Sequence, residues 1–151
     1  MINRTDRKDF DPNGVGLKNG NFIGLPFTEQ TANIVLIPVP WDVTVSYNEG
    51  TAMAPQAILD ASVQLDLFDA DVEDAWKQGI FYQPLNESIL SERDELRPKA
   101  AKYIDFIENG GVLKSNPEMK SILAEINNRC EELNDWVFRA TKEQLDRGKL
   151  V

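Results

Sequence analysis

The pattern of apolar and polar positions begins with an uninterrupted apolar run at Ile34–Ile37. Such a run predicts a strand that is covered on both faces, as in a parallel sheet between helices. Pro38 and Pro40 have no N–H to donate, so regular pairing should stop near them. Residues 41–51 then form a polar loop beyond the carboxyl end of the strand. Ligands bind at that edge in open α/β sheets, so this loop is the first place to look for a site.

Three further elements follow this loop. A helix is expected from Ala54-Pro55, because proline is favoured in the first turn, where its missing N–H costs nothing. The alternation of apolar and polar residues over 63–67 predicts a second strand with one apolar face. Residues 69–78 read as an acidic connection with a helical turn around Ala75 and Trp76. Residues 80–82 are then predicted to form a short third strand that ends before Pro84.

Residues 86–108 carry a helical pattern with one apolar face. That face is formed by Leu96, Ala100, Tyr103, Ile104 and Ile107. Pro98 lies inside the pattern, and an interior proline breaks or kinks a helix. We therefore expect a loose turn followed by the main helix from about Arg97, with Gly110 and Gly111 as its end.

Residues 116–147 are predicted to form the longest helix. Asn116 is a suitable N-cap, Pro117 a suitable first residue and Gly148 a stop. At 1.5 Å per residue the helix would measure roughly 45 Å, so we expect one end to overhang or to meet a partner. One apolar stripe runs along this helix and consists of Met119, Ile122, Leu123, Ile126, Cys130, Leu133, Val137 and Ala140.

Four side chains beside this stripe need a separate interpretation. Glu131 and Glu132 are placed on the solvent face, which does not supply the desolvated carboxylate that acid–base catalysis needs. Trp136 and Phe138 flank the stripe. They either pack in the ordinary way or extend the stripe into a subunit contact, and both interpretations stay open.

The first 32 residues are rich in Asn, Asp, Gly and Lys and predict an extended arm with little regular structure. Phe22, Ile23, Leu25 and Phe27 should fasten part of it to the body. The expected organisation is therefore an arm at 1–32 and one α/β domain at 33–151.

Composition narrows the class of protein. With 42% hydrophobic and 27% charged residues, the chain of 151 residues is globular. Its net charge of -9 argues against nucleic acid and anionic membranes as partners. The longest apolar run is too short to span a bilayer. The single cysteine, Cys130, excludes an internal disulfide and is typical of a cytoplasmic protein.

The chain contains no histidine. This excludes nucleophilic arrangements that depend on histidine within the chain, and one cysteine cannot build a thiolate metal site. An enzymatic role must use carboxylates, lysines, tyrosines or hydroxyls, or residues outside this chain. We therefore predict no catalytic residue and no metal ligand within it.

A cluster of five acidic residues precedes the third predicted strand. The alternation of Asp69, Asp71 and Glu73 resembles a calcium-binding loop, but the turn glycine is missing and Ile80 stands where the closing glutamate would be. A solvated acidic connection is the favoured interpretation. The cluster consists of Asp66, Asp69, Asp71, Glu73 and Asp74.

The segments V-P-W-D, S-Y-x-x-G-T and x-P-x-A-I-x-x-A-S between residues 39 and 62 resemble the amino-terminal part of the ureohydrolase family of arginases, agmatinases and formimidoylglutamases. Ala54 departs from the family's usual glycine and Leu59 from its frequent arginine. The matching positions are Pro40, Asp42, Ser46, Gly50, Thr51, Pro55, Ala57, Ile58 and Ser62.

The resemblance implies a partial three-layer α/β/α fold with a mainly parallel sheet, the amino-terminal portion of an arginase-like fold. It implies a parent hydrolase, with a small guanidino or amidino substrate, in which two manganese ions lower the pKa of a bridging water. The family's metal-binding Gly-Gly-Asp-His, Asp-x-His-x-Asp and Asp-x-Asp motifs are not in this sequence. We therefore expect an inactive amino-terminal piece that binds no cofactor itself.

In such an enzyme the loop after the first strand would border the substrate entrance. Asp42, Ser46, Tyr47 and Glu49 are accordingly the candidate rim residues. In a competing interpretation, Asp42 and Ser46 cap local backbone N–H groups and the loop is only a structural turn.

A different class of function also stays open. The chain could be a non-catalytic acidic interaction domain that uses the long helix to form oligomers. Both interpretations predict self-association, because a short sheet leaves an unpaired edge and the helices leave apolar stripes partly uncovered.

Overall fold

The structure, a computed structural model, describes residues 10–151. These residues form two compact units. The first unit contains residues 10–38, 55–85 and 140–151, and the second contains residues 39–54 and 86–139. The organisation into an arm at 1–32 and a domain at 33–151 stays a prediction, and its residues 1–9 lie outside the described residues.

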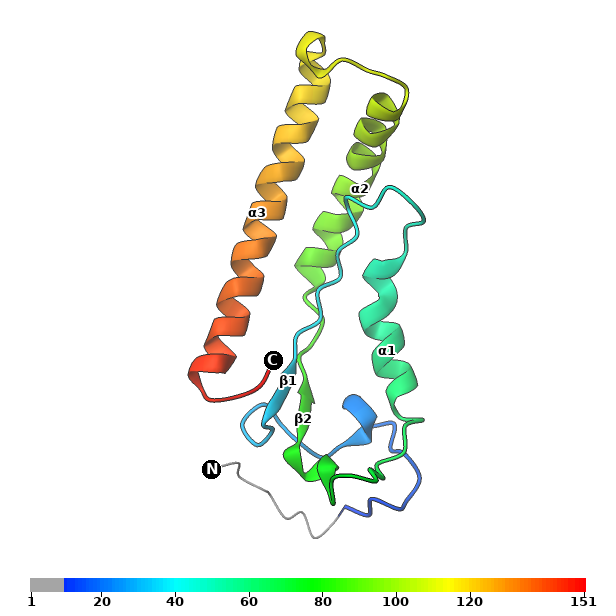
Figure 1. Cartoon of the computed structure of the whole chain (residues 1–151), viewed down its shortest axis with the longest axis vertical. Helices are drawn as coiled ribbons and strands as arrows, with labels where there is room; N and C mark the ends of the chain where they lie inside the picture. Colours follow the sequence, from blue (N-terminus) through cyan, green and yellow to red (C-terminus); the bar gives the residue numbers. More distant parts are fainter. Residues whose placement is uncertain (1–9) are drawn as a thin grey trace. The chain divides into compact units, whose positions relative to one another are not determined.

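The first unit is built on a parallel pair of strands. Strand β1 (Ile34–Leu36) pairs with β2 (Ile80–Tyr82), and Ile34 lies opposite Ile80 (Figure 1). On the other side of β1, Leu150 forms a parallel bridge with Ile34. Val35 N donates to Leu150 O at 2.9 Å, and Leu150 N donates to Asn33 O at 2.8 Å. The predicted α/β class with a parallel sheet is therefore confirmed, and β1 is the central strand of this unit.

The helix predicted at Ala54-Pro55 is also confirmed. Helix α1 (Ala54–Ser62) follows a 3-10 turn, η2 (Thr51–Met53). Within the first unit, residues from Pro55 onward are fastened to β2, because the Tyr82 hydroxyl donates to Pro55 O at 2.8 Å.

The strand predicted over residues 63–67 is wrong, because this segment has no regular structure. Its alternation does not correspond to one buried face, since Leu65 is 57% exposed. Acidic side chains bond the nearby backbone instead: Asp66 Oδ1 accepts from Phe68 N, and Asp69 Oδ1 accepts from Asp71 N. Such local bonds compete with strand pairing.

The core of the first unit lies where the arm meets the segment before β2. Leu25 and Phe27 are buried, as expected of residues that fasten the arm, and they pack with Ala32 and Trp76. Trp76 lies in a 3-10 turn, η3 (Ala75–Gln78), where the sequence predicted a helical turn. A second short turn, η1 (Phe22–Gly24), lies within the arm.

The second unit contains a helical hairpin. Helix α2 (Glu87–Glu108) is followed by a 3-10 turn, η4 (Leu113–Ser115), and by helix α3 (Pro117–Asp146), of which residues 117–139 belong to this unit (Figure 1). Lys99 pairs with Glu125, and Lys102 pairs with Glu118, across the hairpin. Its core is formed by Val43, Leu96, Ala100 and Ile126.

Helix α2 begins ten residues before the predicted start at Arg97, so the expected loose turn is wrong. Asn86 caps the helix by accepting from Ser88 N, and Pro98 lies inside it. The buried side chains of Ile89 and Leu96 show why the first half stays helical. The packing of these side chains stabilises the helix by more than is lost with the backbone hydrogen bond that an interior proline removes.

The boundaries of α3 agree with the prediction. Asn116 Oδ1 accepts from Met119 N at 3.1 Å, which is the expected N-cap bond. Gly148 follows the helix with φ +75°, a conformation that suits glycine at a helix end. Among residues 10–151, none of the helices combines the length and apolar character that crossing a bilayer requires.

Candidate functional site

The four candidate rim residues lie on the loop of the second unit and fall into two kinds. Asp42 is buried, with 3% of its surface exposed, whereas Tyr47 is 84% exposed. Ser46 and Glu49 are exposed as well. The structure thus places Asp42 at the base of the loop and Ser46 and Tyr47 at its tip.

Asp42 uses both carboxylate oxygens to hold the loop. Oδ1 accepts from Arg93 Nε at 2.5 Å, and Oδ2 accepts from Gly50 N at 2.7 Å and Ala52 N at 3.3 Å. The hydrogen bond from Arg93 and the two backbone bonds outweigh burial and hold the pKa of Asp42 at about 2, below its usual 3.8. A carboxylate with so low a pKa and occupied oxygens is a poor general base near neutral pH. Its role in the loop is therefore that of a fixed anchor.

Arg93 and Arg97 lie one helical turn apart on α2 and both face this loop. Their side chains are only 17% and 16% exposed. Arg97 Nη1 donates to Val43 O at 3.0 Å and to Val45 O at 2.9 Å, and its Nε donates to Glu49 Oε2 at 2.9 Å. The carboxyl group of Asp42, with that of Asp94, raises the pKa of Arg93 further above its ordinary value, so it stays charged.

No pattern in the sequence assigns these two arginines to the loop. Their spacing of four residues places them on one face of a helix. They stand about fifty residues from Asp42, however, and nothing in their local pattern names a partner. Glu49, chosen as an exposed rim residue, is also an ion-pair partner of both arginines, at 2.9 Å from Arg97 and 3.5 Å from Arg93.

Several positions that carry the family resemblance have clear structural roles. Gly50 adopts φ +125°, which only glycine takes without strain, and this turns its N–H toward Asp42. Pro40 is fully buried within the second unit. In the first unit, Ser62 Oγ accepts from Ile23 N at 2.9 Å and donates to Leu59 O at 2.7 Å. The resemblance is thus carried largely by residues that fix the backbone.

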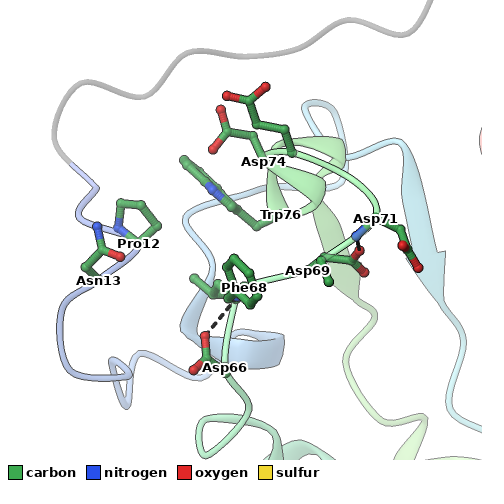
Figure 2. Close-up of a pocket in the computed structure, with 11 residues that line it drawn as sticks. Pro12, Asn13, Asp66, Phe68, Asp69, Asp71, Asp74 and Trp76 are labelled. Atoms are coloured by element: carbon green, nitrogen blue, oxygen red, sulfur yellow. Dashed lines mark hydrogen bonds between the residues drawn. The ribbon is translucent and has the colours of Figure 1, made fainter.

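The acidic cluster lines a cavity of about 490 Å³ in the first unit, with Trp76 at one side and the exposed Phe68 at another (Figure 2). Trp76 is covered by Phe10, whose ring centre lies 5.1 Å away. Asp69 Oδ1 is directed at the amides of Asp71 and Val72, at 2.9 Å each. These contacts describe an acidic connection that organises its own backbone.

Comparison with known proteins bears directly on the resemblance. Residues 32–100, which include the loop and both of its arginines, match the family model described as "Arginase family". This segment belongs to the arginase family. The chain is also similar to the N(1)-aminopropylagmatine ureohydrolase of Synechocystis sp., with 39% identity over 41 residues. No solved structure matches it.

The match with the Synechocystis ureohydrolase covers 27% of this chain and 13% of that protein. The chain therefore corresponds to a small part of the relative's length.

The residues present do not fit the pair of manganese ions that the family implies. Manganese takes carboxylate and imidazole ligands, and the chain has no histidine. Among residues 10–151, no three Asp, Glu or Cys side chains converge to form a metal site. The buried carboxylate of Asp42 has both oxygens engaged by Arg93 and backbone amides. No chemical step through a metal is therefore assigned to this chain.

Proposed function

We propose that this chain supplies scaffold and substrate entrance to an arginase-type ureohydrolase that hydrolyses a C–N bond of a guanidino or amidino compound. The observation that carries the proposal is the arginase-family segment at residues 32–100, whose loop is held by Asp42, Arg93 and Arg97 with its tip exposed. The name of the Synechocystis relative, an aminopropylagmatine ureohydrolase, points to the same class of substrate.

In this proposal the metal-dependent step uses residues that the chain does not contain. The family chemistry would use two manganese ions to lower the pKa of a water molecule, which then attacks the guanidino or amidino carbon. This chain contributes a rigid loop whose Ser46 and Tyr47 would border the entrance. By itself it would bind no manganese tightly and would release no urea, and a reducing cytoplasm is its proposed location.

A chimeric enzyme tests this proposal. The segment of the Synechocystis ureohydrolase that corresponds to residues 32–100 is replaced by residues 32–100 of this chain, and urea release from N(1)-aminopropylagmatine is measured. The expected result is a folded enzyme that retains urea release with manganese. A folded chimera without activity, although the unaltered relative is active, would contradict the proposal. The full chain alone, with manganese and the same substrate, should release no urea.

A second candidate function is a non-catalytic interaction domain. One observation favours it: Phe138, which flanks the apolar stripe of α3, is 67% exposed within the second unit. Aromatic side chains are enriched in the contact surfaces between protein chains. If this function holds, sedimentation should show a stable oligomer that Phe138→Ala converts to monomer, and a clean wild-type monomer at high concentration would exclude it.

A further inference from the structure

We infer that Arg97 is the positioning residue of the loop tip formed by Ser46, Tyr47 and Asn48. The guanidinium of Arg97 binds the loop on both sides of this tip. On one side it donates to Val43 O and Val45 O, and on the other it donates to the carboxylate of Glu49. One side chain therefore closes the base of the loop.

The second arginine supports the same arrangement from the adjacent turn of α2. Arg93 binds Asp42 at 2.5 Å, and its Nη2 lies 3.5 Å from Glu49 Oε2. Asp42 in turn accepts from the amides of Gly50 and Ala52. Asp42 thus fixes the end of the loop that enters η2, whereas Arg97 connects the two sides of the loop.

An arginine is needed at position 97 for a geometric reason. Its planar guanidinium presents Nε and Nη1 to different partners at the same time, two carbonyl oxygens and one carboxylate. The ammonium of a lysine is a single point on a flexible chain and cannot reproduce this fork. Because Arg97 is only 16% exposed, water competes little for these bonds.

The tip itself has few restraints of its own. Tyr47 is 84% exposed, and Asn48 adopts φ +46°, an uncommon backbone conformation for a non-glycine residue. Bonds at the base of the loop would select this conformation from the others open to the tip. That the tip borders a substrate entrance rests on the proposed function, whereas its positioning by Arg97 does not.

Amide hydrogen exchange on the full chain tests the positioning role. In Arg97→Ala, exchange at the amides of Val45 and Gly50 should become at least about tenfold faster, while the amide of Ile126 in α3 keeps its rate. Arg139→Ala, which changes an exposed arginine of α3, is the matched control and should alter neither. Unchanged loop exchange in Arg97→Ala, or an equal acceleration at Ile126, would overturn the inference.

Rescue experiments separate positioning from simple loss of packing. Millimolar guanidinium should restore most of the loop protection in Arg97→Ala, whereas sodium at equal ionic strength should not. Arg97→Lys should restore only part of it. If Arg97→Ala does not fold, Glu49→Gln removes the ion pair while keeping the size of the side chain, and it should accelerate the same two amides. Failure of guanidinium rescue in a folded variant would contradict the role.

The chimeric enzyme then connects the tip to the entrance. Arg97→Ala in that enzyme should raise KM by about tenfold and change kcat by less than about twofold, because a displaced rim weakens binding more than chemistry. An equal fall in kcat with unchanged KM would overturn this part of the inference. An inactive parent chimera contradicts the proposed function alone, since the exchange results on the full chain do not depend on activity.

Discussion

Asp42 makes contacts that its local sequence indicates only in part. The sequence marks it as a loop carboxylate beside a strand end, open either to a ligand or to local capping. In the structure it caps Gly50 and Ala52, and it also pairs with Arg93, fifty-one positions away. The capping follows from sequence reasoning about Asp side chains. The ion pair does not, because only the tertiary packing of α2 against the loop brings Arg93 to it.

Replacing this carboxylate tests the value of the ion pair. Asp42→Asn should lower the free energy of unfolding by about 2–3 kcal/mol, because Arg93 loses its buried counter-charge and one acceptor is weakened. Asp94→Asn is the matched control, since Asp94 also bonds Arg93 but its side chain is 63% exposed. Asp94→Asn should lower the free energy of unfolding by less than about 0.5 kcal/mol. Urea unfolding measures both, and equal losses in the two variants would contradict the assigned anchor role.

The same carboxylate makes stability depend on pH. Its pKa is about 2 in the folded chain and 3.8 ordinarily, so the stabilisation is complete above about pH 3.8 and is lost as the pH falls toward 2. This difference corresponds to about 2 kcal/mol. The pKa of Glu29 is also lowered, chiefly by a hydrogen bond from Gln144. Glu29 therefore adds to the loss of stability as the pH falls. In Asp42→Asn, the free energy of unfolding should therefore fall less steeply across this pH range, although some fall should remain. An unchanged slope would contradict the contribution assigned to Asp42.

At the scale of elements, the sequence predicts those whose signals are local. Helix α3 has its N-cap at Asn116 and its stop at Gly148, and β1 ends before Pro38 as expected. Two predictions were wrong, one because of local hydrogen bonds and one because of packing. Residues 63–67 do not form a strand, because acidic side chains bond the nearby backbone. Helix α2 begins well before Pro98, because buried residues stabilise its first half.

Strand β2 depends on the residue before it. Gly79 adopts φ +70°, and a Cβ atom there would lie 2.6 Å from the ring of Phe27, which is buried in the first unit's core. Gly79→Ala should therefore destabilise the chain by about 3 kcal/mol, through backbone strain and overpacking together.

Gly20→Ala is the matched control for this substitution. Gly20 also has positive φ, +82°, but no atom lies within 4 Å of its virtual Cβ. Gly20→Ala should lower the free energy of unfolding through backbone strain alone, by about 1 kcal/mol. Thermal or urea unfolding that gives the same loss for both variants would show that the Phe27 contact is not costly.

At the scale of the whole chain, the anchored loop and the amino-acid composition support the same proposal for the function. An arginase-family segment at residues 32–100 brings a well-anchored loop and a parallel sheet, while the complete absence of histidine removes the imidazole ligands of a metal centre. The net charge of -9 does not supply a site, since the acidic side chains of residues 10–151 do not gather in threes around a common point. These observations support the proposal that this chain contributes a substrate entrance and not the metal centre.

Calorimetric titration of the full chain with manganese alone tests this claim most directly. The account predicts no saturable heat of binding in the micromolar range at neutral pH, because no described group of side chains offers three metal ligands. The Synechocystis ureohydrolase, titrated in the same way, provides the comparison. One or two micromolar manganese sites per molecule of this chain would contradict the account.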